Sequence, residues 1–432
     1  MAHLIRDDTE AVEVARELAA RLAVGAARRD ADRTPPVTEL AELSESGLLG
    51  ITVPREHGGA GVGAVTLGEV FRLLSAADPS IGQIPQNHFF FVRVLAENGT
   101  GEQRAFFYAE LLKGRRFGNA LAEAGAANAF EFRTRLTRRP DGDYTVSGTK
   151  SYATGSPFAH WIPVYATDEE GRVHAVFIPR DAPGLEVVDD WSGFGQRTTG
   201  SGTVHLNDVR VPADRVVPHY RTFERPEVFG AFGQYMHAAI DVGIAGGALA
   251  EGASFVRASA RPWPEAGVDR LAREPLVIQK FGELALLVRA AEALLVRAGQ
   301  ALDAALGHPS PAGPERSSGD PEPAAGAGDP AAAPRSGPGG SGGFGSLTAE
   351  DPVAEASLAV AAARAQGDIA ALTVSSEVLG VVGARASLER YNLDRHWRNA
   401  RTHTLHDPRR WKLQHLGDHA LNGVAPPPNG IV

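Results

Sequence analysis

The chain contains no cysteine among its 432 residues. A protein without cysteine forms no disulfide, no thiolate metal site and no iron–sulfur cluster, and it has no thiol nucleophile. An excess of positive charge is also missing, because 52 acidic side chains outnumber 43 lysines and arginines and give a net charge of −9. This balance argues against non-specific binding to nucleic acid or to an anionic membrane surface.

Long uninterrupted apolar runs are absent as well. The strongest run, residues 284–296, is broken by Arg289 and Glu292, so we expect no segment that spans a membrane. The first residues are charged and amphipathic, and they lack the apolar core of a signal peptide. With 43% hydrophobic and 22% charged residues, the composition is that of an ordinary soluble protein, and we expect a cytoplasmic enzyme of two or three domains.

The first two regions of the chain differ in their periodicity. Residues 1–118 show helical periodicity between Gly- and Pro-rich breaks, with a first helix predicted over residues 9–28. Residues 119–227 change to short alternating segments, which predicts a small β domain with mostly antiparallel strands. Three turn signals separate these segments, at residues 140–143, 168–171 and 207–208.

The C-terminal region, residues 228–432, is predicted to form a four-helix bundle. Apolar side chains recur from Phe281 to Leu302 at alternating spacings of three and four residues, the stripe of a bundle helix. Small residues recur at the same spacing over residues 352–382, which predicts a closely packed partner helix. Between these helices, residues 307–350 are rich in Pro, Gly, Ala and Ser. We interpret this insertion as a disordered loop, with a lid as the alternative.

The segment from Tyr391 to Lys412 contains the most informative residue, His406. Its core reads Arg-Thr-His-Thr-Leu-His-Asp-Pro over residues 401–408. This pattern resembles the C-terminal motif of acyl-CoA dehydrogenases, in which many members carry a glutamate that removes a proton from the carbon next to a thioester. Here an imidazole, followed by Asp407, stands in place of that carboxylate. An imidazole suits a site beside a flavin and oxygen, because it can donate or accept a proton near neutral pH.

Three further segments, residues 119–128, 148–155 and 195–212, resemble flavin-contacting motifs of the same family. In the second of them, Tyr152 falls on the aromatic residue beside the flavin ring. Thr154 falls on the residue that contacts flavin N5, where a hydroxyl can donate or accept as the redox state changes. A turn or a β-strand also explains Asn119 and Thr154 without any function. The resemblance implies cofactor contacts from Asn119, Ala122, Asn128, Tyr152, Thr154, Ser201 and Asp407.

The order of helices, β domain and helical bundle is that of the acyl-CoA dehydrogenase fold, an α+β fold, and the resemblance covers nearly the whole chain outside the insertion. More specifically, the chain resembles a branch of flavin monooxygenases that includes dibenzothiophene monooxygenase and the sulfur-acquisition oxidoreductases. These enzymes pair a helical histidine with one in the His-Asp-Pro motif, which implies catalytic roles for His88 and His406 together with Thr154. A histidine on an apolar helix face, such as His88, is also explained as a core residue.

The same resemblance implies a two-component reaction. A separate NAD(P)H-dependent flavin reductase would supply FMNH2, with FAD as a possible cofactor. Reaction with O2 would then form a C4a-hydroperoxyflavin that oxygenates a small substrate, with an organosulfur compound favoured. The resemblance also implies a homotetramer whose flavin sites are completed across an interface, with Gly383 in the matching helix-end loop. Apolar substrate walls are expected from Phe89, Phe91 and Phe232.

Two other functions and a metal site are alternatives. The first function is an FAD-dependent acyl-CoA dehydrogenase with a relocated base, although Arg270 and Arg273 are out of register with the family's pyrophosphate-binding arginine. The second is a flavin-fold scaffold without turnover. The histidines near the C-terminus lack the His-Glu-x-x-His pattern, so we expect a solvated helix face there and no metal. These histidines are His403, His406, His415 and His419.

Overall fold

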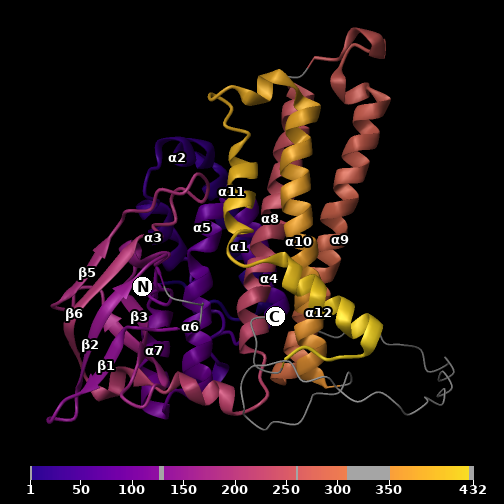
Figure 1. Ribbon diagram of the computed structural model, residues 1–432. Coiled ribbons are helices and arrows are strands. Elements are labelled where there is room, and N and C mark those ends of the chain that lie inside the picture. Colours follow the sequence, from indigo (N-terminus) through magenta and orange to yellow (C-terminus); the bar gives the residue numbers. More distant parts are fainter. Residues whose placement is uncertain (1, 126–130, 259–260, 309–350, 428–432) are drawn as a thin grey trace, which may run out of the picture.

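The computed structural model describes residues 2–125, 131–258, 261–308 and 351–427 (Figure 1). The prediction of a disordered insertion falls almost wholly outside these residues, and Asn128 also lies outside them. In Figure 1 the sheet forms one side of the molecule and the long helices form the other, with the N-terminal helices between them.

The N-terminal region is helical, as predicted. The first helix ends earlier than expected, because Gly25 takes a left-handed conformation with φ of 82°, which glycine adopts without steric cost. A second helix then begins at Ala26. The side chain of Asp7 caps the first helix by accepting the Glu10 amide hydrogen at 3.0 Å. The helices are α1 (Asp8–Ala23), α2 (Ala26–Asp32), α3 (Val37–Glu45), α4 (Ala64–Ala77), α5 (Pro79–Gln83), α6 (Pro85–Asn98) and α7 (Gly101–Leu112).

The central region forms one seven-stranded sheet of order β5-β6-β2-β1-β3-β4-β7. Neighbouring strands are antiparallel except β1 and β3, so the predicted β domain is confirmed. The turn signals at residues 140–143 and 168–171 connect β1 to β2 and β3 to β4, as predicted. The strands are β1 (Arg135–Arg138), β2 (Tyr144–Lys150), β3 (Trp161–Thr167), β4 (Val173–Pro179), β5 (Leu185–Val188), β6 (Thr203–Val211) and β7 (Val216–Val217).

The third predicted turn, at residues 207–208, is wrong, because β6 runs through it without a break. Asp208 has a φ of 49°, a conformation that aspartate tolerates, and its carboxylate accepts the Ser147 hydroxyl at 2.6 Å. The pairing of β2 with β6 shifts register between Val146 and Gly148. The polar pair therefore marks a β-bulge rather than a hairpin.

The C-terminal region contains long antiparallel helices. These are α8 (Phe229–Ala258), α9 (Pro275–Leu306) and α10 (Pro352–Val382), followed by the shorter α11 (Arg395–His403) and α12 (Arg409–Asn422). The predicted stripe of α9 is buried at Leu284, Val288, Leu295 and Leu302. In α10, a Cβ at Gly367 would lie 3.3 Å from the Ala238 carbonyl oxygen of α8, so small residues let these two helices approach closely. The predicted bundle is confirmed.

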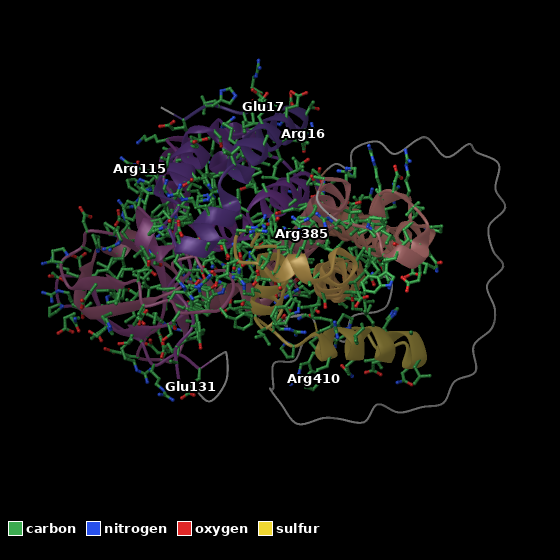
Figure 2. The ribbon with its side chains drawn as sticks, turned by 90° about the horizontal axis from the view of Figure 1, so that it is seen from above. Arg16, Glu17, Arg115, Glu131, Arg385 and Arg410 are labelled. Atoms are coloured by element: carbon green, nitrogen blue, oxygen red, sulfur yellow. The ribbon has the colours of Figure 1, made fainter. Side chains whose placement is uncertain are left out.

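Helix α8 passes the length and hydropathy test for a membrane span, but 67% of its most apolar window is buried inside the molecule. By contrast, charged side chains of the N-terminal region such as Arg16, Glu17 and Arg115 point outward (Figure 2). Because most of its apolar window is buried, α8 is a core helix of the bundle.

Helix α11 joins the N-terminal region to the bundle. Arg398 of α11 forms an ion pair with the buried Asp30 of α2 at 2.7 Å. Arg395, on the same helix, forms an ion pair with Glu251 of α8. Because α11 is held from both sides, its C-terminal end, which carries His403, is fixed relative to α8.

Candidate functional site

A chain of hydroxyl groups lies in the β domain at the predicted flavin-contacting positions. The Thr154 and Ser201 hydroxyl oxygens are 2.8 Å apart, and Ser201 is 2.7 Å from the Thr199 hydroxyl oxygen. The Thr199 hydroxyl donates to the Gln196 carbonyl oxygen at 3.0 Å, which fixes the direction of one end of the chain. Tyr152 stands beside it with φ of 54° and 61% of its surface exposed, so its ring is free to cover a ligand.

Asn119 adds an unpaired acceptor to this region. Its side-chain amide donates to the Tyr152 carbonyl oxygen at 3.3 Å, while its Oδ1 is buried without a hydrogen-bond partner among the described residues. Buried acceptors are normally paired, so this oxygen suits a ligand with an N–H group, such as a flavin ring. Ala122 contributes only backbone, since its carbonyl oxygen accepts the Ser151 amide hydrogen at 2.9 Å. The residues present therefore fit a flavin.

The loop that carries these hydroxyls packs directly against α11. A Cβ at Gly195 would lie 1.9 Å from the Arg398 carbonyl oxygen, so the glycine of this motif is required by close approach. The Gln196 backbone amide donates to Asn399 Oδ1 at 2.7 Å. Asn399 precedes His403 by one helical turn, which brings the hydroxyl chain and the C-terminal histidines into one region.

A buried network of charged and imidazole groups connects α8, α10 and α11. His403 Nδ1 is 2.6 Å from Asp241 Oδ1, and His403 Nε2 is 2.9 Å from His237 Nδ1. The second oxygen of Asp241 pairs with Arg364 of α10. All four side chains are buried, with relative exposures between 0% and 4%. Burial, followed by the nearby His406 and His403, lowers the pKa of His237 well below its ordinary value, so this ring is neutral at pH 7.

His406 lies on the open side of this network. Its ring centroid is 4.1 Å from that of His237, and no hydrogen bond joins its ring nitrogens to another described residue. The residue is exposed, yet desolvation by the surrounding protein lowers its pKa to about 4 and outweighs the opposing effect of Asp407. A neutral imidazole with free nitrogens can accept a hydrogen bond with one and donate with the other.

Asp407 is held by two cations. Its carboxylate lies 3.5 Å from Arg364 and 2.9 Å from the buried ammonium group of Lys412. Burial alone would raise the pKa of Asp407, but Arg364 and Lys412 outweigh it and lower the pKa. Asp407 is therefore a carboxylate that is already paired, and its neighbour His406 is the group with unused hydrogen-bonding capacity.

His88 is placed differently from its predicted role. Its Nε2 hydrogen-bonds the Leu49 carbonyl oxygen at 2.9 Å, and its Nδ1 accepts the Phe117 amide hydrogen at 3.1 Å. Burial lowers its pKa to about 4. Both ring nitrogens are thus used by the backbone, and the structure does not bring His88 together with His406. This placement supports the alternative of a satisfied core histidine.

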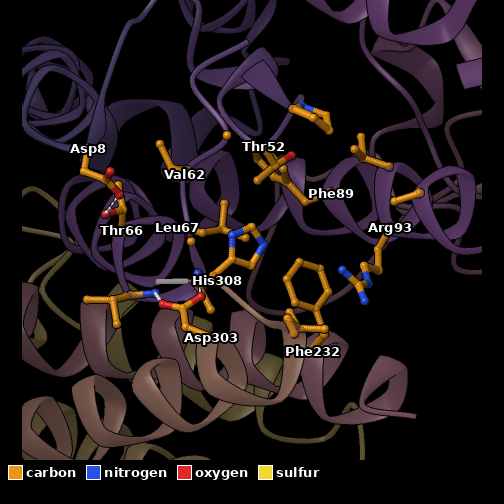
Figure 3. Close-up of a pocket in the computed structure, with 18 of the residues that line it drawn as sticks. Asp8, Thr52, Val62, Thr66, Leu67, Phe89, Arg93, Phe232, Asp303 and His308 are labelled. Carbon is orange, nitrogen blue, oxygen red and sulfur yellow. Dashed lines mark hydrogen bonds between the residues drawn. The ribbon is translucent and has the colours of Figure 1, made fainter. Parts of the chain in front are cut away.

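A cavity of about 850 Å³ lies between α4, α6, α8 and the end of α9 (Figure 3). Of the three residues predicted as substrate walls, Phe89 and Phe232 line this cavity, whereas Phe91 does not. Phe91 is instead packed against Tyr165 and Phe177 in a separate cluster. Phe232 precedes His237 by five residues on α8, or about 7.5 Å along the helix axis. Five residues also turn the helix by about 140°, so the two side chains leave α8 on different sides, and no residue of the histidine network lines the cavity.

Gly383 lies at the far end of α10, exposed and with a φ of 78°. Nothing in the described part of the chain lies within 4 Å of where its Cβ would stand. Its contact with a flavin across a subunit interface stays a prediction. The C-terminal histidines are not arranged as ligands either: the described residues hold no group of three or more His, Asp or Glu side chains suited to a metal ion.

His237, Asp241 and Arg364 were not predicted from the sequence. Each is a polar residue inside a long apolar helix, where an ionisable group is costly unless it is paired. His237 and Asp241 are also four residues apart on α8, a spacing that puts both on one face. Ionisable residues on one face of an apolar helix therefore indicate that buried partners exist. The sequence does not identify those partners.

Comparison with known proteins first defines the class. Residues 6–115, 120–209 and 235–316 match the N-terminal, middle and C-terminal domains of acyl-CoA dehydrogenases. The chain is 31% identical to a dibenzothiophene monooxygenase of Rhodococcus erythropolis, over 98% of this chain and 95% of the relative. It is 28% identical to the probable FMNH2-dependent monooxygenase SfnC of Pseudomonas putida, over 97% and 96% of the two chains.

Solved structures agree with these relatives. The FMN-bound TdsC of Paenibacillus sp. A11-2 superposes with a TM-score of 0.83 at 28% identity, covering 98% of this chain and 100% of that one. Methanesulfinate monooxygenase MsuC of Pseudomonas fluorescens gives 0.81 at 27% identity, covering 98% and 99%. The chain belongs to the flavin-dependent monooxygenase branch of the acyl-CoA dehydrogenase family. The predicted fold and branch are confirmed.

Proposed function

We propose that the protein uses reduced FMN and O2 to oxygenate the sulfur atom of a small organosulfur compound. The observation that carries this proposal is the neutral His406, with free ring nitrogens, at the place where dehydrogenases of this family carry a carboxylate base. Relatives named for dibenzothiophene and methanesulfinate support a sulfur substrate, and the FMN-bound relative supports FMN over FAD.

The hydroxyl chain of the β domain would hold the flavin ring. Thr154 and Ser201 can donate or accept, Asn119 offers its unpaired oxygen, and the exposed Tyr152 can cover the ring. When bound, reduced flavin supplies the reaction with O2 that no side chain can perform. Gly383 of a second subunit is a further predicted contact.

His406 would hold a proton close to the reacting oxygen. With no carboxylate base free near it, because Asp407 is bound by Arg364 and Lys412, the site is poorly suited to removing a proton from carbon. Phe89 and Phe232 would give the substrate its apolar walls and exclude water from the site.

The remaining partners are a flavin reductase and further copies of this chain. Reduced flavin reacts with O2 in free solution, so a separate NAD(P)H-dependent reductase must supply it in the same compartment, which we propose is the cytoplasm. We propose a homotetramer because large apolar side chains are exposed along α9 and α12. These side chains are Leu276, Ile278, Leu286, Val296, Trp411, Leu413 and Leu421.

The test is a single turnover under ¹⁸O2. Protein is mixed anaerobically with photoreduced FMN and either dibenzothiophene or methanesulfinate, and ¹⁸O2-saturated buffer is then added. We expect a sulfur-oxygenated product that carries ¹⁸O. Quantitative release of hydrogen peroxide with both substrates, and with FAD in place of FMN, would contradict the proposal. A tightly bound FAD that accepts electrons from an acyl-CoA would favour the dehydrogenase instead.

A further inference from the structure

The buried carboxylate Asp241 lies at one end of a line of two imidazoles. Asp241 Oδ1 is 2.6 Å from His403 Nδ1, and His403 Nε2 is 2.9 Å from His237 Nδ1. Beyond His237 lies the ring of His406, with 4.1 Å between the two centroids and 31° between their planes. The hydrogen-bonded line thus runs from a fully buried anion to His237, and a ring contact without a hydrogen bond joins His237 to His406, the exposed residue of the proposed site.

The hydrogen bonds fix where protons can reside. Asp241 is paired with Arg364 and acts as an acceptor, so His403 must donate its Nδ1–H to it. Exactly one proton can then occupy the bond between His403 Nε2 and His237 Nδ1. When both rings are neutral, that proton belongs to His237, and His237 Nε2 is left with a lone pair. No described residue hydrogen-bonds this nitrogen.

We propose that Asp241, His403 and His237 form a proton relay behind His406. A proton that binds His237 Nε2 forms an N–H bond there, while the Nδ1–H bond of His237 breaks and an Nε2–H bond forms on His403. His237 is neutral again after this step, and the positive charge rests on His403 beside the Asp241 carboxylate. The reverse step returns the proton to the site. His403 and Asp241 are therefore positioning residues that act through His237.

The charges around the relay suit this transfer. Five further charged groups face the relay: Arg364 and Asp368 of α10, Arg409 and Lys412 of α12, and the loop residue Asp407. Counting Asp241, these groups are three anions and three cations, and Arg401 of α11 adds a further cation near Asp368. An added proton on His403 is then stabilised mainly by its direct partner, Asp241.

His396 and Glu251 form a second buried contact between an imidazole and a carboxylate, but this contact is not part of a relay. His396, on the same helix as His403, is buried and bonds Glu251 at 2.8 Å through Nε2. Its other nitrogen, Nδ1, is buried without a partner among the described residues, so no proton can pass onward. His396→Gln is therefore a matched control for His403→Gln: each removes one buried, carboxylate-bound imidazole from α11.

The first experiment observes the protons directly, in protein free of flavin and substrate. Two-bond ¹⁵N–¹H correlation spectra of ¹⁵N-histidine-labelled protein report the tautomer of each ring. At pH 8 we expect Nδ1–H tautomers at both His403 and His237, and loss of the His237 preference in His403→Phe, which cannot hydrogen-bond. A neutral His403 in the Nε2–H form would overturn the relay.

The second experiment follows product against pH. Because the relay's purpose rests on the proposed function, wild-type turnover is measured first, and its absence would count against that function while the tautomer result still decides the relay. We expect His403→Gln to form product roughly 10²-fold more slowly, with a flatter pH profile. His396→Gln should keep the wild-type profile within about twofold. A wild-type rate and profile in His403→Gln would overturn the proposal. If that variant does not fold, Asp241→Asn, measured in the same way, decides.

Discussion

The buried His88 and the buried pair of His403 and His237 differ in the groups to which they are hydrogen-bonded. His88 gives one nitrogen to the Leu49 carbonyl oxygen and the other to the Phe117 amide, so its partners are backbone atoms that do not ionise. His403 and His237 are bonded to each other and to the Asp241 carboxylate. The first arrangement joins elements of the fold, whereas the second leaves a proton free to move.

It follows that a lowered pKa alone does not distinguish a proposed catalytic imidazole from a structural one. His88 is buried and His406 is exposed, yet desolvation by the surrounding protein lowers the pKa of both to about 4. What separates them is the unused hydrogen-bonding capacity of each ring. His406 has ring nitrogens with no partner among the described residues, and both ring nitrogens of His88 are used by the backbone.

The largest expected effect is at His406. We expect His406→Gln to slow product formation by about 10²- to 10⁴-fold, the usual contribution of a positioned acid or base. Binding of reduced FMN should stay within about tenfold of the wild type, and the thermal transition should be unchanged because His406 makes no hydrogen bond to the described residues. Product assays measure the rate, stopped-flow mixing measures the binding of reduced FMN, and thermal denaturation measures the transition.

The control for His406 is His415→Gln, on the adjacent helix α12. It removes an imidazole that touches neither the relay nor the hydroxyl chain. Equal losses in the two variants would show that the assay reports general damage to α12, and normal turnover by His406→Gln would remove His406 from the proposed mechanism.

The second effect is on stability and concerns Arg364. This side chain is 2% exposed and pairs with both Asp241 and Asp407. Arg364→Gln leaves two carboxylates without their shared cation, and we expect a loss of about 3–5 kcal/mol in the free energy of unfolding. Arg409→Gln removes a more exposed partner of Asp368 and should cost less. Urea denaturation of both variants measures the difference, and equal losses would show that the network does not depend on Arg364.

The fold was largely predictable from local patterns. The stripe over residues 281–302 and the small residues of 352–382 each fix one face of a helix, and the structure confirms α9 and α10 there. The pattern at residues 207–208 was misinterpreted, because an Asn-Asp pair serves a turn and a β-bulge equally well. Only the pairing of β6 with β2, a contact far apart in sequence, decides between them.

The site was predictable only where a motif carried it. Thr154, Ser201 and His406 came from resemblance, and the structure places the first two in hydrogen-bonding contact. His237 and Arg364 could not be assigned, because their partners come from other helices and no spacing within one helix specifies them. Phe91 and Phe89 are two residues apart, yet only Phe89 lines the cavity, since helical rotation turns Phe91 toward the sheet.

The third prediction tests whether His88 stabilises the fold through its two hydrogen bonds to the backbone. His88→Gln keeps at most one of two buried hydrogen bonds, and we expect a loss of about 1–3 kcal/mol in the free energy of unfolding at pH 7. The folded pKa of His88 is about 4 and its ordinary value is 6.5, so wild-type stability falls as pH decreases through this window. The variant lacks this term, and the stability gap should narrow at pH 5. A fully stable variant that forms no product would restore His88 to the catalytic site.

The smallest expected effect concerns Glu227, a buried group whose partner is again the backbone. Its carboxylate accepts the Phe229 amide hydrogen at the start of α8. Burial, aided by Glu97, raises its pKa from 4.5 to about 7. The folded state therefore holds a proton that the unfolded state has lost, and stability decreases as pH rises from 4.5 to 7.

Glu227→Gln keeps the acceptor and removes the charge, so we expect its Tm to exceed the wild-type value by roughly 2 °C at pH 8 and to match it at pH 4. A variant that is less stable at pH 8 would mean that the charged carboxylate stabilises the start of α8. In that case a backbone partner can sustain a buried charge here, and the contrast between the His88 contact and the Asp241 network would lose its physical basis.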